Sequence, residues 1–331
     1  MVYVFLLFGF LLLVKGADYF VDGSSSIARS LRIPPLLIGL TIVAFGTSAP
    51  EAAVSVTASI EGQNGIALGN IIGSNIFNLL CVVGMSAFIK PLSVKKSILL
   101  KEFPFLILSS VLLLILCNDF IFQSSQNSIL SLSDGLVFLM FFGIFIYYLV
   151  EVSINSRNKN RNLATNINIE LSNNDSPCTQ SNISLSKSIV LSIIGILGII
   201  IGGKLVVDCS SNIALSFGVS QKMIGLTIVS IGTSLPEFIT SVVAASKGES
   251  DIALGNVIGS NIFNILFILG VSSLINPISV DPTLFLDICI MIIVTIIAYI
   301  FAIRKKDISK FEGVILIGSY ILYMVYVVLK N

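Results

Sequence analysis

The chain has 331 residues, of which 55% are hydrophobic and only 11% are charged. Because soluble domains carry about 25% charged residues, this composition predicts an integral membrane protein rather than a soluble domain. The net charge is +1 and histidine is absent, so neither a nucleic-acid partner nor a histidine-based transition-metal centre is expected.

Apolar stretches of about 20 residues, long enough to cross a bilayer, recur along the whole chain. We expect ten spans, at residues 2–21, 33–60, 66–89, 98–117, 132–150, 189–207, 219–246, 252–275, 284–303 and 314–329. The first stretch lacks a basic start and a small-residue cleavage site, which predicts a retained span rather than a signal peptide. Residues 151–186 are rich in Asn and Ser without apolar periodicity, and we expect a flexible linker there.

One stretch of the chain occurs twice. Gly39–Asn78 reads GLTIVAFGTSAPEAAVSVTASIEGQNGIALGNIIGSNIFN, and Gly225–Asn264 reads GLTIVSIGTSLPEFITSVVAASKGESDIALGNVIGSNIFN. The two copies align without a gap and are identical at roughly two-thirds of their positions. Each copy sets one carboxylate, Glu51 or Glu237, beside a proline within an apolar run. An intramembrane carboxylate is costly and typically marks an ion or substrate path.

Basic residues indicate the orientation in the membrane. If the N-terminus lies outside, fifteen Lys and Arg residues fall in inside loops and only Lys222 and Lys330 fall outside. We therefore expect a multi-pass protein of the cell membrane with both termini outside and a cytoplasmic linker. Asp22, Asp208, Glu61 and Glu249, near span ends, are expected to be interfacial charges, and Lys15 is expected to pair with Asp18 or to extend towards the membrane surface.

The expected membrane orientation implies that the two copies of the repeat cross the membrane in opposite directions. Each half holds five spans, an odd number, so the second half enters the membrane from the opposite side. The predicted fold class is an all-α membrane protein of ten transmembrane helices arranged as two inverted five-helix repeats, at residues 1–150 and 187–331, joined by the linker 151–186. Inverted repeats with broken helices near the midplane are typical of secondary transporters.

The repeated GTSxPE segment supplies oxygen ligands. Pro50 and Pro236 lack an N–H and free the carbonyls of Gly46 and Gly232 within their helices. Such carbonyls are tolerated in a membrane only where they face protein or a polar cavity. Hydroxyls and a carboxylate accompany them in each half, from Thr47, Ser48 and Glu51 and from Thr233, Ser234 and Glu237. These hard oxygens suit sodium and calcium.

The second part of each repeat adds a polar helical face. Asn70, Ser74 and Asn78 recur at a spacing of four and share one face, as do their counterparts Asn256, Ser260 and Asn264. The pairs Gly69 with Gly73 and Gly255 with Gly259 predict close helix packing. Two buried carboxylates would repel each other if left empty, so the site requires calcium, several monovalent cations or protons.

These motifs resemble the alpha repeats of the cation/calcium exchanger superfamily, most closely the prokaryotic sodium/calcium exchanger type with ten spans and a short central loop. The resemblance covers nearly the whole chain. It implies electrogenic antiport of sodium against calcium by alternating access, with these ions and the lipid bilayer as the only partners and no cofactor. The expected oligomeric state is a monomer.

The resemblance also implies a ligand set. Glu51 and Glu237 would bridge a central calcium site, which the carbonyls of Thr47 and Thr233 would complete. Flanking sodium sites would use Ser48, Ser74, Ser234, Ser260 and the backbone at Ala44 and Ser230. Asn78 and Asn264 would line a middle site, through water or behind the ligands. Many relatives carry Asp at the position of Asn264, and potassium-dependent relatives rely on that acid, so we expect potassium independence.

Other classes fit less well. A proton-coupled calcium exchanger is the nearest alternative, although the serine hydroxyls favour sodium because protons need no such ligands. A cation channel is built from parallel subunits and needs no inverted repeat. An intramembrane hydrolase using the two glutamates would lack an activated nucleophile or a metal-binding histidine, so no enzymatic activity is expected.

Overall fold

The computed structural model describes residues 2–31, 33–62, 64–118, 128–170, 185–217, 230–282 and 284–330. Within these ranges, eight continuous helical segments are long and apolar enough to cross a membrane, and one further span is a bent pair of helices. The predicted seventh span is described only from Ser230 onward. The chain is therefore an all-helical, multi-pass membrane protein.

The first half of the chain begins with α1 (Val2–Leu31). The broken span follows as α2 (Pro35–Ile38), η1 (Gly39–Val43), α3 (Ala44–Thr47) and α4 (Ala49–Ile60), in which η marks a π-helical turn. The next spans are α5 (Asn64–Phe77) with η2 (Asn78–Val82) and α6 (Val83–Ile89), then η3 (Ile98–Glu102) with α7 (Phe103–Leu116), then α9 (Leu132–Glu170).

The second half repeats this order. It comprises α10 (Leu185–Ser216), the short α12 (Ser230–Thr233) with α13 (Leu235–Ser246), and α14 (Ser250–Phe263) with η5 (Asn264–Ile268) and α15 (Leu269–Ile275). The last two spans are α16 (Leu284–Lys305) and α17 (Lys310–Lys330). Asn78 and Asn264, which are equivalent in the two copies of the repeat, each begin a π-helical turn. Such turns are frequent at functional sites.

The repeated motif interrupts its helix at the same place in both halves. The backbone leaves the helical conformation at Ser48 (φ −81°, ψ 7°) and at Ser234 (φ −89°, ψ 4°), two residues before each proline. In the first half the axis bends by 49° at this break. The predicted opening of each helix near its proline is thereby confirmed, and the glutamate in the turn that follows each break is buried.

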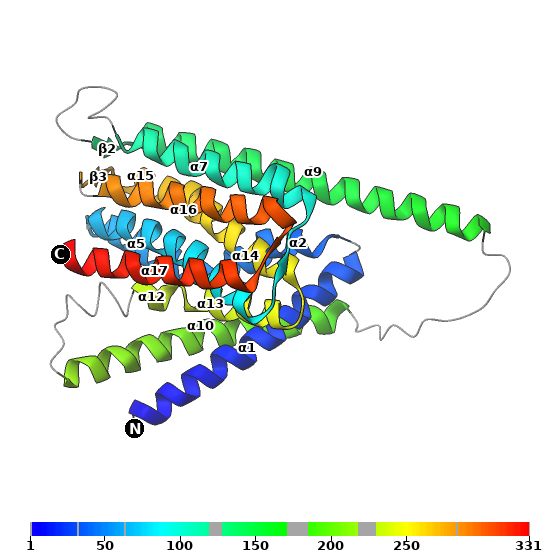
Figure 1. Cartoon of the computed structure of the whole chain (residues 1–331), viewed down its shortest axis with the longest axis horizontal. Coiled ribbons are helices and arrows are strands. Elements are labelled where there is room, and N and C mark those ends of the chain that lie inside the picture. The colour runs from blue at the N-terminus through cyan, green and yellow to red at the C-terminus, as the bar shows by residue number, and fades with distance from the viewer. Residues whose placement is uncertain are drawn as a thin grey trace.

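Two helix lengths differ from the sequence prediction. α1 continues to Leu31 rather than ending near residue 21, because Gly23 and Ser24 to Ser26 are buried in the bundle and suit close packing despite their polarity. α9 continues to Glu170, so the first part of the predicted flexible linker is helical. No Gly or Pro, the residues most unfavourable to a helix, interrupts residues 151–170. The end of α9 extends beyond the bundle (Figure 1).

Glycines bring α1 and α10 into backbone contact. The two helices lie side by side at one edge of the molecule (Figure 1). A Cβ added at Gly16 would lie 2.8 Å from the carbonyl oxygen of Gly195, and one added at Gly202 would lie 2.7 Å from that of Gly9. Such small residues allow transmembrane helices to approach closely, where van der Waals packing holds them together.

The second repeat also uses its glycines to pack against the first. A Cβ at Gly255 would lie 2.9 Å from the carbonyl oxygen of Leu36, and one at Gly259 would lie 2.7 Å from that of Leu40. The predicted close packing is confirmed for this pair. For Gly69 and Gly73 no described atom lies within 4 Å of the added Cβ, and most of the equivalent partner segment lies outside the described residues.

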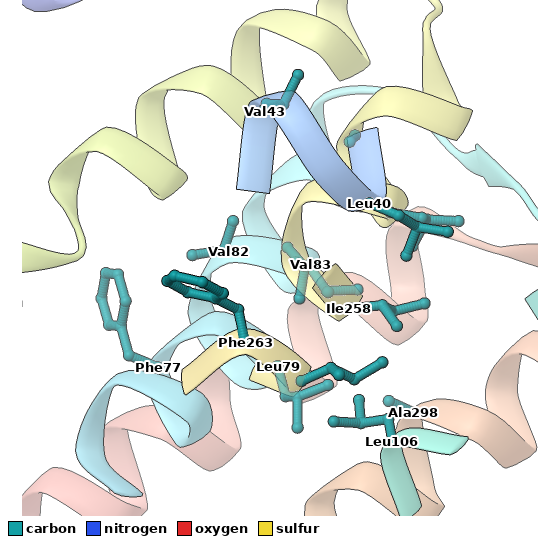
Figure 2. Packing of buried hydrophobic residues seen from close by; sticks show 14 of the residues in the cluster. Leu40, Val43, Phe77, Leu79, Val82, Val83, Leu106, Ile258, Phe263 and Ala298 are labelled. Atoms are coloured by element: carbon teal, nitrogen blue, oxygen red, sulfur yellow. The ribbon is translucent and has the colours of Figure 1, made fainter. Parts of the chain in front are cut away.

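Two small antiparallel sheets join loops from opposite halves. β1 (Leu92–Ser93) pairs with β4 (Asp307–Ile308), and β2 (Ser128–Leu130) pairs with β3 (Ile278–Val280). Between them lies one apolar core to which both halves contribute. Figure 2 shows part of it, with side chains from η1, η2, α7, α14 and α16 gathered around Leu79 and Ile258.

Charged side chains cluster at the turn between α13 and α14. Lys247 contacts Asp22 at 2.8 Å and Asp18 at 3.2 Å, both on α1. Arg29 lies 3.6 Å from Glu249, and Lys95 pairs with Asp251 in the same region. The expected pair of Lys15 and Asp18 is present at 3.9 Å. Asp22 and Glu249 therefore each pair with a basic residue of the other half, and these pairs connect α1 to the second half.

Candidate functional site

The two repeated carboxylates begin the helices that follow the breaks. Glu51 lies in the first turn of α4, and Glu237 lies in the first turn of α13. Both side chains are fully buried. The free N–H groups and the macrodipole of a helix N-terminus favour negative charge, which stabilises a carboxylate at this position.

Each carboxylate is contacted by a serine from the other repeat. Ser48 Oγ donates to Glu237 Oε1 at 2.8 Å, and Ser234 Oγ donates to Glu51 Oε1 at 2.9 Å. Both serines are fully buried at the point where their helix breaks. The site is therefore shared between the two halves of the chain, and neither half contains it alone.

The polar face of α5 and that of α14 close the sides of this site. Ser234 Oγ lies 2.9 Å from Ser74 Oγ, and Ser260 Oγ donates to the carbonyl oxygen of Ala44 at 3.4 Å. The predicted serines of both halves are thus brought together around the two glutamates.

The threonines and the first asparagines of the repeats lie just behind. Thr47 Oγ1 donates to Asn256 Oδ1 at 3.0 Å, and Thr233 Oγ1 donates to Asn70 Oδ1 at 3.5 Å. Asn256 in turn donates to the Glu237 carbonyl at 3.3 Å. Because these hydroxyls engage the opposite repeat, the backbone around Thr47 and Thr233 is held against α14 and α5, respectively.

Among the predicted backbone ligands, Ala44 is fully buried and begins α3. Ser230 begins α12, and its side chain lies outside the described part of the chain.

Four acceptor oxygens at this site have no hydrogen-bond partner among the described residues. They are Glu51 Oε2, Glu237 Oε2, Asn78 Oδ1 and Asn264 Oδ1. A buried polar atom without a partner is costly, and such an atom needs a structural or functional explanation. Four unpartnered oxygens that include two carboxylates would be satisfied by cations that prefer hard oxygen ligands.

The chemistry of the donor set fits the same class of ligand. Within the described residues, no group of three or more His, Cys, Asp or Glu side chains could hold a metal ion. The oxygens around the glutamates come instead from hydroxyls, amides and carbonyls, which suit sodium and calcium better than zinc or copper.

Two residues of the network are absent from the sequence prediction. Asn75 and Asn261 are fully buried and hydrogen bond to Asn264 and Asn78. Both lie in the repeated GSNIFN segment, so their identity in the two copies was an available signal. The spacing of four that relates Asn70, Ser74 and Asn78 does not include them, and their role depends on contacts between the two repeats.

Comparison with known proteins finds a matching family and relatives similar along nearly the whole chain. Residues 1–151 and 187–329 match the family described as sodium/calcium exchanger protein. The sodium/calcium exchanger MaX1 of Methanosarcina acetivorans is 35% identical over 348 residues, covering 98% of this chain and 97% of that protein. CaxA of Alkalimonas amylolytica is 40% identical over 324 residues, covering 97% of this chain and 96% of that protein.

A solved structure is also similar along the full length. The sodium-calcium exchanger NCX_Mj, soaked with 10 mM Na+ and zero Ca2+, has a TM-score of 0.81 and 33% identity, with 98% of this chain and 99% of that chain covered. The repeated motifs, the helical bundle with its broken span and these similarities lead to one assignment: the chain belongs to the sodium/calcium exchanger protein family.

Proposed function

We propose that this chain is a secondary active antiporter that exchanges sodium for calcium across the membrane by alternating access. The observation that carries the proposal is the buried pair Glu51 and Glu237, each contacted by a serine of the other repeat and each with one unpartnered oxygen. Two buried negative charges must be balanced by cations in every state. A site that is always loaded with one ion set or the other acts as an exchanger rather than as a channel.

The proposed ligands follow the contacts. Glu51 and Glu237 bridge a calcium ion, with the carbonyls of Thr47 and Thr233 completing the shell. The sodium sites lie beside it and use the oxygens of Ser48, Ser74, Ser234 and Ser260 together with the carbonyls of Ala44 and Ser230. Asn78 and Asn264 line the middle of the site. This assignment is supported by the full or nearly full burial of the described side chains in the set and by their contacts across the two repeats.

Exchange is proposed to be electrogenic and independent of potassium. More than two sodium ions per calcium would move net positive charge in each cycle. Asn264 is neutral, so the site has two carboxylates rather than three and needs no extra monovalent cation to balance a third charge.

The proposed topology is ten spans in two inverted five-helix repeats, at 1–150 and 187–331. The equal order of elements, the breaks at Ser48 and Ser234 and the π-helical turns at Asn78 and Asn264 support it. Both chain ends lie towards the left of Figure 1, as an even number of crossings requires. The positive-inside count puts both termini outside and the 151–186 connection in the cytoplasm.

Transport into proteoliposomes tests the proposal. Vesicles containing the purified chain would be loaded with sodium and diluted into radioactive calcium, with sodium, potassium and pH gradients varied separately. We expect calcium uptake that requires the outward sodium gradient and is stimulated by an inside-positive potential, since sodium leaves with net positive charge. It should be indifferent to potassium and, at clamped potential, to protonophore.

The alternative outcomes are distinct. Uptake driven by a pH gradient without sodium would contradict sodium coupling and support a proton-coupled calcium exchanger. Uptake that needs no counter-gradient would contradict exchange altogether.

A further inference from the structure

Four fully buried asparagines, Asn75, Asn78, Asn261 and Asn264, form a hydrogen-bonded group that we call the asparagine bridge. It joins the end of α5 and the start of η2 to the end of α14 and the start of η5. Asn264 Nδ2 donates to Asn75 Oδ1 at 3.1 Å, and Asn78 Nδ2 donates to Asn261 Oδ1 at 3.0 Å. The two contacts are equivalent under exchange of the repeats.

Backbone carbonyls fix the orientation of Asn75 and Asn261. Asn261 Nδ2 donates to the carbonyl oxygen of Asn75 at 3.2 Å, and Asn75 Nδ2 donates to that of Asn261 at 3.5 Å. Asn75 Nδ2 also lies 3.7 Å from Met291 Sδ. Because a carbonyl only accepts, each of these amides must turn its NH₂ group towards the backbone and its oxygen towards the neighbouring asparagine.

The fixed orientation of Asn75 and Asn261 also determines the orientation of the side-chain amides that they contact. Asn264 and Asn78 must present their NH₂ groups to the oxygens of Asn75 and Asn261, since a flipped amide would place oxygen against oxygen. The remaining oxygens, Asn78 Oδ1 and Asn264 Oδ1, have no partner among the described residues. Asn264 Nδ2 also lies 3.4 Å from Ser74 Oγ, one of the proposed ligands.

We propose that Asn75 and Asn261 are positioning residues that hold Asn264 and Asn78 with their amide oxygens, rather than their NH₂ groups, available to a cation. The proposal rests on the proposed function of the site. An asparagine can offer either an acceptor or two donors, and only the acceptor attracts a cation. A short chain of contacts anchored on the backbone therefore decides whether the middle of the site is attractive or repulsive to sodium and calcium.

An aspartate at position 264 provides the discriminating background. Both oxygens of a carboxylate are acceptors, so Asp needs no neighbour to choose its orientation. Replacing Asn75 should therefore raise the half-saturating sodium concentration when residue 264 is Asn. It should not raise it when residue 264 is Asp, because a carboxylate oxygen then faces Asn75 Oδ1 and the replacement removes that repulsion. A residue with only a packing role would have the same effect in both backgrounds, because its packing environment is otherwise unchanged.

The experiment measures half-saturating sodium and calcium concentrations and maximal rates in proteoliposomes for the wild type, Asn75→Leu, Asn264→Asp and the double variant. We expect Asn75→Leu to raise the half-saturating sodium concentration by about tenfold in the wild-type background, which is the effect of one misdirected buried polar group. In the Asn264→Asp background we expect no increase. The mirror series, Asn261→Leu with Asn78→Asp, should give the same pattern.

The control is Asn118→Leu, because Asn118 is also buried and, within the described residues, donates to the carbonyl of Leu114 in the last turn of the preceding helix α7. It should leave both half-saturating concentrations unchanged. If leucine prevents folding, Asn75→Ala and Asn261→Ala test the same dependence with a smaller side chain. Equal losses in both backgrounds would overturn the positioning role while leaving the exchanger intact. A wild type that neither exchanges nor binds the two cations would overturn the proposed function and this inference together.

Discussion

Ser48 Oγ donates a 2.8 Å hydrogen bond to Glu237 Oε1, although the two residues lie 189 positions apart in the chain. Ser234 makes the equivalent contact to Glu51 at 2.9 Å. Each half of the protein thus supplies a carboxylate and satisfies the carboxylate of the other half. This exchange of contacts, rather than any single ligand, explains why the same motif is present twice, and the following predictions depend on it.

Removing one negative charge should abolish calcium transport. Glu51→Gln or Glu237→Gln keeps the side-chain shape and the contact to the opposite serine, but it halves the buried charge that we propose balances calcium. We expect sodium-driven calcium uptake to fall by about a hundredfold or more, which corresponds to about 2.7 kcal/mol. Proteoliposome uptake measures the effect, with size-exclusion chromatography to show that the variants fold.

Glu312→Gln is the matched control for these variants. Glu312 is also a buried carboxylate in the first helical turn, and it accepts hydrogen bonds from Ser309 at 2.8 Å. It lies outside the site, so its amide variant should transport normally. Retained exchange in Glu51→Gln or Glu237→Gln would remove that glutamate from the ligand set.

Ser48 and Ser234, which contact the glutamate of the opposite repeat, should differ in how strongly their removal raises the half-saturating sodium concentration. The Ser234 hydroxyl lies within hydrogen-bond distance of both Glu51 and Ser74. Among the described residues, the Ser48 hydroxyl forms a side-chain hydrogen bond only with Glu237. We expect Ser48→Ala to raise the half-saturating sodium concentration by about threefold and Ser234→Ala by about tenfold, from the loss of one and two buried hydrogen bonds. Exchange rates over a sodium series give both values. Ser319→Ala, at a half-buried serine bonded within its own helix, should have no effect. A larger loss for Ser48→Ala would contradict this ranking.

The contact between α1 and α10 should tolerate no added methyl group. Gly16→Ala would place a Cβ 2.8 Å from the backbone of α10, at Gly195 and Ile199. Because backbone cannot move aside as a flexible side chain can, we expect a loss of about 1–3 kcal/mol in stability. Thermal unfolding in detergent should show a lower midpoint for this variant than for Gly143→Ala, whose added Cβ meets no described atom within 4 Å. An equal midpoint for the two variants would contradict backbone contact at Gly16.

A third acid in the site should change its dependence on monovalent ions. Asn264→Asp adds a buried charge beside Ser74 and Asn75, and a buried charge must be neutralised by a further cation or a proton. We expect calcium exchange in this variant to become stimulated by potassium, or to become more sensitive to pH than exchange by the wild type. Uptake measured over a potassium series and a pH series at constant sodium would detect either change. Unaltered dependence on both would show that Asn264 does not set the charge of the site.

The sequence predicts which polar residues gather between the two repeats better than it predicts the lengths of the helices. Glu51 and Glu237 could be identified because duplication and an intramembrane charge mark the same positions, and the helix break at Ser48 follows from the proline two residues later. The true end of α1 could not be read from hydropathy, since Ser24 to Ser26 are polar yet buried. The helical continuation of α9 to Glu170 likewise has no apolar signal.

Pairing between the two repeats is the part that one sequence does not reveal. Asn75, Asn78, Asn261 and Asn264 are all asparagines, so residue type does not distinguish their roles. Only the contacts between the two repeats show that Asn75 and Asn261 face Asn264 and Asn78, respectively. Similarly, the glycines of α1 gave no indication that α10, rather than a neighbouring span, lies against them. Such choices depend on tertiary packing between distant segments.

The reciprocal serine–glutamate contacts also restrict how the chain can change over time. A substitution at Ser48 acts on Glu237, so its compensation has to arise in the other copy of the motif rather than beside it. After the duplication that produced the two copies, each half became part of the environment of the other. The two motifs are therefore expected to drift together, and a half taken from a distant relative would bring with it a partner serine fitted to another glutamate.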